Sequence, residues 1–133
     1  MNRFIYIITV AVLTSVIHTP NCIAQYREIR RLLTEVQNYI YEKPDSAIAV
    51  LKGYENLASQ DDGTEALYAM LITKAEYIST DSIASDSLIQ KAVKDYNKEI
   101  SFESAHASYY LGCYYVSRDK NKAAYSFQNS IDF

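Results

Sequence analysis

The one histidine beyond the apolar N-terminal region, His106, lies close in sequence to Cys113, and these two side chains are the first candidates for chemistry. A zinc site takes three or four His, Cys or carboxylate ligands, and a catalytic pair needs a third group that orients the base. His106 and Cys113 have no such group beside them at a suitable spacing. We therefore expect no enzymatic activity, no metal site and no cofactor.

Two acidic segments could in principle bind a cation. Asp61-Asp62-Gly63 shares its composition with a calcium loop, but the alternating acids and the terminal Glu of a twelve-residue loop are missing. The stretch that holds Asp81 and Asp86 among serines has the composition of a solvated turn with a helix cap. Both segments are predicted to be surface turns.

The composition favours an all-α protein. Three Gly and two Pro in 133 residues leave few places where a helix must end. The net charge of −3 comes from interspersed acids and bases, and the only cluster of basic residues is Arg27, Arg30 and Arg31. This pattern argues against nucleic acid as a partner.

The first 24 residues have the features of a secretory signal peptide. Arg3 supplies the positive charge, and an apolar run from Phe4 to Ile17 follows it. That run is shorter than the roughly 20 residues that a membrane-spanning helix needs. We predict a signal peptide over residues 1–24 and a helical repeat domain over residues 25–133.

Two routes of processing would both export the chain to the periplasm or the cell envelope. Cleavage after Ala24 would leave Gln25 as the mature N-terminus and Cys113 as the remaining cysteine. Lipid attachment at Cys22 is the alternative, although Thr19 and Asn21 depart from the usual lipobox residues. Mass spectrometry of the exported protein would distinguish the two.

The rest of the chain repeats with a period of 38 residues. Four columns of similar side chains recur at this spacing: Tyr39, Tyr77 and Tyr115; Ile40, Ile78 and Val116; Ala47, Ser85 and Ala123; Leu51, Ile89 and Phe127. A small residue followed four positions later by a large apolar one marks a single helix face. The period therefore predicts three repeated units.

Each unit is expected to contain two helices. Apolar residues from Ile29 to Ile40 lie on one helix face, and Pro44 begins the next helix. Asp62 and Glu65 have the spacing of a capping box at the start of the second unit. The predicted helices cover about 26–41, 45–59, 64–78 and 85–97. The third unit is expected to open near Ser101, to run through Ala105 to Ser117, and to turn at 118–121, around Asp119, before a last helix through Ala123 and Ile131.

The third unit resembles the tetratricopeptide repeat (TPR) family. Its segment Tyr110-Leu111-Gly112-Cys113-Tyr114-Tyr115, followed by Ala123, Phe127 and Ser130, is similar to the TPR signature of Leu-Gly, Tyr, Ala, an aromatic and a small residue. Gly112 and Ala123 would let the paired helices approach closely. The first two units match in part, and a Sel1-like variant is the alternative. With its predicted export signal, the whole chain resembles the N-terminal part of bacterial secreted TPR proteins.

The resemblance implies a right-handed superhelix of about three helix-turn-helix repeats whose concave groove binds a peptide or helix. The chain is then a non-catalytic scaffold for a protein or peptide partner of unknown identity. The alternative is the N-terminal sensor segment of a longer, membrane-linked regulatory protein. The residues expected to line the groove are His106, Tyr109, Cys113 and Val116 in the third unit, and Ala66, Ala69, Thr73 and Glu76 in the second.

The last helix is expected to carry an uncovered apolar edge, because no further helix follows it in this sequence. Such patches usually mark interfaces. Self-association, or contact with a partner, is predicted through Tyr125, Phe127, Ile131 and Phe133.

Overall fold

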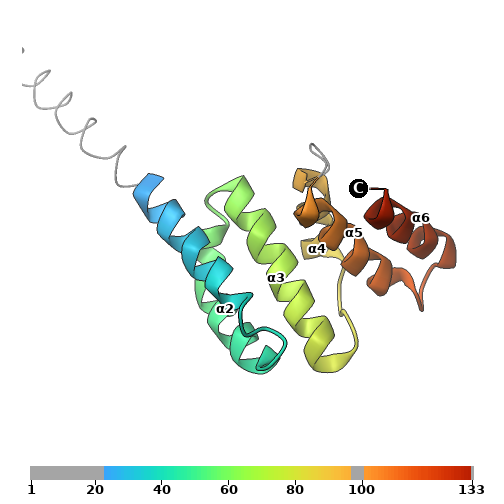
Figure 1. The fold of residues 1–133 in the computed structure, drawn as a ribbon, viewed down its shortest axis with the longest axis horizontal. Coiled ribbons are helices and arrows are strands. Elements are labelled where there is room, and N and C mark those ends of the chain that lie inside the picture. The colour runs from blue at the N-terminus through green and yellow to red at the C-terminus, as the bar shows by residue number, and fades with distance from the viewer. Residues whose placement is uncertain (1–22, 97–100, 133) are drawn as a thin grey trace, which may run out of the picture.

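A computed structural model describes residues 23–96 and 101–132, and the described residues form helices and no strand (Figure 1). The first helix covers 23–36, and the others are α2 (Pro44–Ala58), α3 (Asp62–Thr80), α4 (Ser87–Tyr96), α5 (Phe102–Tyr115) and α6 (Lys120–Ile131). The prediction of an all-α protein is confirmed. Residues 1–22 of the predicted signal peptide lie outside the described residues. Among the residues that are described, no helix is long and apolar enough to cross a membrane.

The helices pack in the order of the chain. Each labelled helix contacts the next one, and α3 also contacts α5 across the α4 connection. In Figure 1 the helices follow one another along the long axis of the molecule, from the first helix in blue to α6 in red. The helix pairs predicted from the 38-residue period are thus present as neighbouring antiparallel helices.

The helix boundaries follow from caps and breaking residues. Pro44 stands at the start of α2, where the missing amide hydrogen costs nothing. Ser101 accepts a hydrogen bond from the Ser104 amide at the start of α5, and Asp119 accepts from the Asn121 and Lys122 amides at the start of α6. The openings near Ser101 and Asp119 that the sequence predicts are therefore found.

The cap of α3 differs from the predicted capping box. Asp61, not Asp62, is the N-cap residue, and its carboxylate accepts from the Thr64 amide at 3.0 Å and the Thr64 hydroxyl at 2.6 Å. Glu65 instead forms an ion pair with Lys91 of α4 at 2.6 Å. Thr64 is buried and provides two donors, so the carboxylate that reaches both of them becomes the cap.

The first helix is shorter than predicted, and α3 is longer. After residue 36 the chain continues in tight turns in which the amides of Gln37, Asn38 and Tyr39 donate to carbonyls three residues before them. Pro44 disfavours helical geometry at Lys43, so the chain leaves the α-helix before it reaches this point. Ile40 in these turns is nevertheless buried, as the periodicity predicts.

The core is centred on α3. Ile29, Leu33 and Val36 of the first helix, Leu51 of α2 and Ile89 of α4 are buried in the same cluster. In α3 the buried residues are consecutive from Ala66 to Ala75, so they cover the whole circumference of the helix. A helix of this kind must be surrounded by other helices.

The α5–α6 pair depends on a glycine. A Cβ atom on Gly112 would lie 2.5 Å from Phe127 Cε1 and 2.6 Å from its Cδ1, well inside van der Waals contact. Ala123 of α6 is buried, and Phe127 also stacks against Tyr109 with ring centroids 5.8 Å apart. The predicted role of Gly112, to allow close approach of the paired helices, is confirmed by this geometry.

We predict that Gly112→Ala destabilises the protein by about 1–3 kcal/mol, because the added methyl group collides with the Phe127 ring. Gly53→Ala is the matched control, since a Cβ there has no heavy atom within 4 Å, and it should stabilise the protein by about 0.4–1 kcal/mol. Urea melts measure both, and replacing Phe127 by Leu should reduce the cost of Gly112→Ala. Equal effects of the two glycine substitutions would show that the close contact is unimportant.

The outer side of α6 is partly apolar. Among the labelled helices α6 contacts α5 alone, and Tyr125 and Ile131 are 70% and 72% exposed. Phe127 does not belong to this edge, because its ring packs against Gly112 and Tyr109. Phe133 lies outside the described residues.

Self-association through this edge stays a prediction. We expect the purified full chain to form concentration-dependent oligomers, and Ile131→Glu to shift it toward the monomer by placing a charge in the contact. Val50→Glu on α2, another exposed apolar position, should leave the oligomers unchanged. Size-exclusion chromatography with light scattering measures the mass, and a monomer at every concentration would contradict the prediction.

Candidate functional site

Three of the four groove residues predicted in the second unit are in the core. Ala66, Ala69 and Thr73 are buried, and the Thr73 hydroxyl donates to the Ala69 carbonyl at 2.8 Å. Ala66 lines a depression of about 290 Å³ between α3 and α4, together with Glu65 and Lys91. Ala69 and Thr73 are covered by the neighbouring helices. A groove through all three residues stays a prediction.

Glu76 of α3 is partly exposed. Burial, and after it the negative charges of Glu55 and Glu76, raise the pKa of Tyr68 to about 12. Tyr68 itself is buried.

The four residues predicted in the third unit lie around two adjoining depressions. His106 and Tyr109 line one of them, and Tyr109, Cys113 and Val116 line the other. Tyr77 of α3 belongs to both. The structure thus brings the four third-unit residues together, at the surface between α3 and α5.

We call the first of these the aromatic depression; it has a volume of about 450 Å³. It is lined by residues from the turn after the first helix and from α3, α5 and α6: Tyr41, Tyr77, Ile78, Ala105, His106, Tyr109, Tyr110 and Ser130. Ring centroids are 6.0 Å apart for Tyr77 and Tyr110 and 5.2 Å for Tyr109 and Tyr110. Edge-to-face contacts of this kind hold the walls in place.

His106 lies between an exposed and a buried ring. Its imidazole is 4.0 Å from the Phe102 ring and 6.4 Å from the Tyr110 ring, measured between centroids. Burial lowers the pKa of His106, the positive charge of Lys74 lowers it further, and Glu103 acts in the opposite direction. The imidazole is therefore neutral at pH 7 and offers ring surface rather than charge.

Cys113 is held between two tyrosines. The hydroxyls of Tyr109 and Tyr77 hydrogen-bond the sulfur, but burial outweighs these bonds and raises the pKa of the thiol. A raised pKa keeps the thiol protonated and a poor nucleophile. Cys113 is free and partly buried, and it lies in the wall of the second depression.

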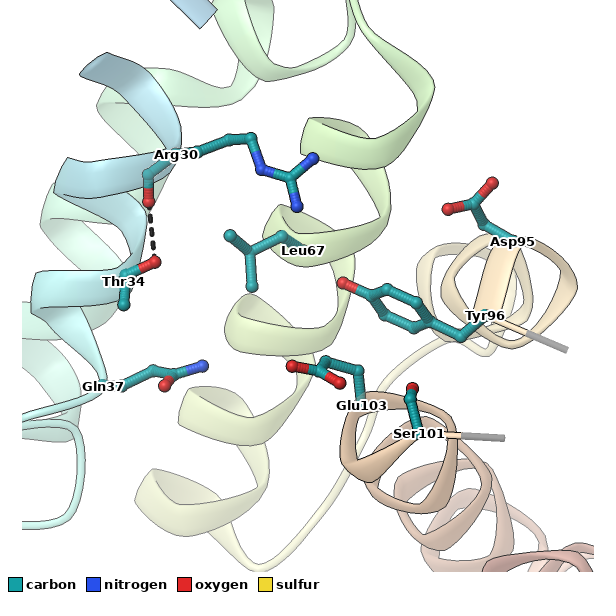
Figure 2. Close-up of a pocket in the computed structure, with 8 residues that line it drawn as sticks. All are labelled: Arg30, Thr34, Gln37, Leu67, Asp95, Tyr96, Ser101 and Glu103. Atoms are coloured by element: carbon teal, nitrogen blue, oxygen red, sulfur yellow. Dashed lines mark hydrogen bonds between the residues drawn. The ribbon is translucent and has the colours of Figure 1, made fainter. Parts of the chain in front are cut away.

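A further depression of about 460 Å³ lies over α3, nearer to the start of that helix. Figure 2 shows Arg30 reaching over Leu67, while the Tyr96 hydroxyl and the Glu103 carboxylate point into the same space from the opposite side. Thr34, Gln37, Asp95 and Ser101 complete the lining. We call it the polar depression.

The polar and aromatic depressions lie on one face of the molecule. Arg30, Thr34, Gln37 and Tyr41 are spaced three or four residues apart and so lie on one side of the first helix and its extension. Glu103, His106 and Tyr110 have the same spacing in α5. We call this surface, formed by the first helix with its turn, α3 and α5, the three-helix face.

Sequence reasoning missed the contributions of the first helix and of α3 to this face. The face of α3 passes through Leu67 and Ile78, one position away from the predicted stripe of Ala66 and Ala69. Buried residues surround α3, so no polar stripe in its sequence marks the side that borders the two depressions. The 38-residue period gave one indication of this face. It groups Tyr77 with Tyr39 and Tyr115 at equivalent positions of the repeat, and Tyr77 lines the aromatic depression.

Within the described ranges, no group of three or more His, Cys, Asp or Glu side chains could hold a metal ion. The aromatic and polar depressions contain aromatic, amide, hydroxyl and single charged groups, which suit recognition of another molecule by contact. The chain shows no significant similarity to any family model, to curated protein sequences or to solved structures with which it was compared.

Proposed function

We propose that the chain is a non-catalytic interaction scaffold of the TPR type that binds a peptide or helix of a partner protein on the three-helix face. The observation that carries this proposal is the continuity of that face. Side chains of the first helix with its turn, of α3 and of α5, far apart in sequence, line both the polar and the aromatic depression. Asp95 and Tyr96 of α4 add to the polar depression, and Ser130 of α6 adds to the aromatic one. An elongated surface of this kind suits a linear segment better than a small compact ligand.

The chemistry of the face agrees with protein recognition. Tyr41, Phe102 and Tyr109 are exposed aromatic residues on or beside it. Aromatic side chains are enriched at protein interfaces because they combine large contact area with little loss of side-chain freedom. Arg30 and Glu103 in the polar depression add charges that can fix the direction of a bound segment.

The repeat family and the place of action are part of the same proposal. The TPR signature around Gly112, together with the Gly112–Phe127 contact and the serial packing of helix pairs, supports the family. The apolar N-terminal run after Arg3 supports export to the periplasm or cell envelope. The partner is then a protein of that compartment.

We predict that selection of a random peptide library on the purified full chain yields peptides that bind the three-helix face. The double variant Tyr41→Ser, Tyr109→Ser should weaken binding of these peptides at least tenfold, because exposed aromatic residues at the centre of an interface supply much of its affinity. Fluorescence anisotropy with labelled peptides measures the dissociation constants.

The control is Tyr125→Ser, which removes an equally exposed tyrosine from α6, outside the three-helix face. It should leave affinity unchanged. A library that yields no binders, or binders that tolerate the double variant on the three-helix face, would argue against the proposed function.

A further inference from the structure

Lys74 is a buried lysine in the middle of α3. Only 7% of its surface is exposed, and its ammonium lies 4.5 Å from the centre of the Tyr41 ring. Lysine is almost never this buried without a carboxylate partner. Among the described residues, the ion pairs within 4.0 Å involve Arg31 and Lys91, and none involves Lys74.

The position of Lys74 is directly behind the wall of the aromatic depression. Tyr41, which covers the ammonium, lines that depression together with His106 and Tyr110. His106 is close enough for the Lys74 charge to act on it, and Tyr110 is close enough to Tyr41 for the two hydroxyls to interact. A cation thus lies under the Tyr41 ring, beside the aromatic depression that this ring lines.

Burial of a charge is unfavourable unless another group compensates for it. The face of an aromatic ring compensates only in part, since cation–π contacts contribute about 0.5–2 kcal/mol. Tyr41 is 65% exposed, and its ring is held against the ammonium by this contact and by the interaction of its hydroxyl with that of Tyr110. The ring can therefore move aside when a stronger partner for the charge arrives.

We propose that the Lys74 ammonium binds a carboxylate of the partner segment, so that the three-helix face recognises an acidic peptide. This inference rests on the proposed function and specifies its ligand. The carboxylate would enter the aromatic depression, displace the Tyr41 ring from the ammonium, and accept hydrogen bonds from the hydroxyls of Tyr41 and Tyr110.

A single negative charge fits this environment better than a phosphate group. Lys74 is one cation, the neighbouring imidazole of His106 is neutral at pH 7, and Glu103 is close enough to that imidazole for its negative charge to act on it. A phosphate carries up to two negative charges at neutral pH and would leave one of them without a partner. The carboxylate can belong to an Asp or Glu side chain or to a peptide C-terminus.

The test uses three fluorescein-labelled peptides of the same length, built from Leu, Ala and Ser. The first carries one central Glu and an amidated C-terminus, the second has Gln in place of Glu, and the third is the Gln peptide with a free C-terminal carboxylate. We expect the full chain to bind the first or the third at least tenfold more tightly than the second. The tighter of the two identifies the source of the carboxylate.

Lys74→Met should reduce this preference to less than twofold, because the methionine side chain keeps the length but has no charge. Lys52→Met, the same substitution at an exposed position of α2, should retain the preference of the original chain. Circular dichroism melts of each variant show whether it is folded. If Lys74→Met does not fold, the affinities of the unchanged protein for the three peptides still test the carboxylate site.

Equal affinity for all three peptides would overturn the carboxylate site while leaving the proposed function intact. A preference that survives in Lys74→Met would also overturn it, as would tighter binding of a phosphoserine peptide than of the Glu peptide. Failure of all three peptides to bind would contradict the site as well. The library selection would then remain as the separate test of the proposed function.

Discussion

The structure depends on the packing of α3 on all of its sides. This helix contacts α2, α4 and α5, and its residues from Ala66 to Ala75 are buried without interruption. Ala66, Ala69 and Ala75 are small enough to let neighbouring helices approach, while Leu71 and Ile72 fill the space between them. Each unit of the repeat is therefore held through α3, and the three-helix face exists because the first helix and α5 pack on either side of it.

The same packing explains how a buried lysine lies under a residue of that face. Lys74 is in the last part of the buried run, where Tyr41 reaches across from the turn after the first helix. Tyr41 and Tyr110 come from the first and third units and meet over α3. The units are thus connected by side chains at the three-helix face as well as by their core.

Much of the architecture was predictable, because a helix that packs on one side has a visible period. Leu51 and Ile89, which belong to one column of the 38-residue repeat, are buried in the core, and so are Ile29 and Ile40. Gly112 could be assigned to a close helix contact from its place in the signature. The choice of Asp61 over Asp62 as a cap was not predictable, since it depends on which of two adjacent carboxylates reaches Thr64.

The side of α3 that borders the polar and aromatic depressions could not be read from the sequence for a related reason. Where apolar and small residues surround a helix, no stripe in the sequence marks one of its sides. Ala66, Ala69 and Thr73 line neither the polar nor the aromatic depression. The turn with Asp86 was predicted as solvated, yet its carboxylate accepts a hydrogen bond of 2.8 Å from the Tyr115 hydroxyl of α5. Such long-range contacts leave no local pattern.

The most direct test of this account is native-state hydrogen exchange measured by mass spectrometry. If α3 holds the units together, its amides from Leu67 to Ala75 should exchange only through global unfolding, and those of α6, which among the labelled helices contacts α5 alone, should exchange earlier. Amides of α3 that exchange as fast as those of α6, through local opening, would contradict the central place given to this helix.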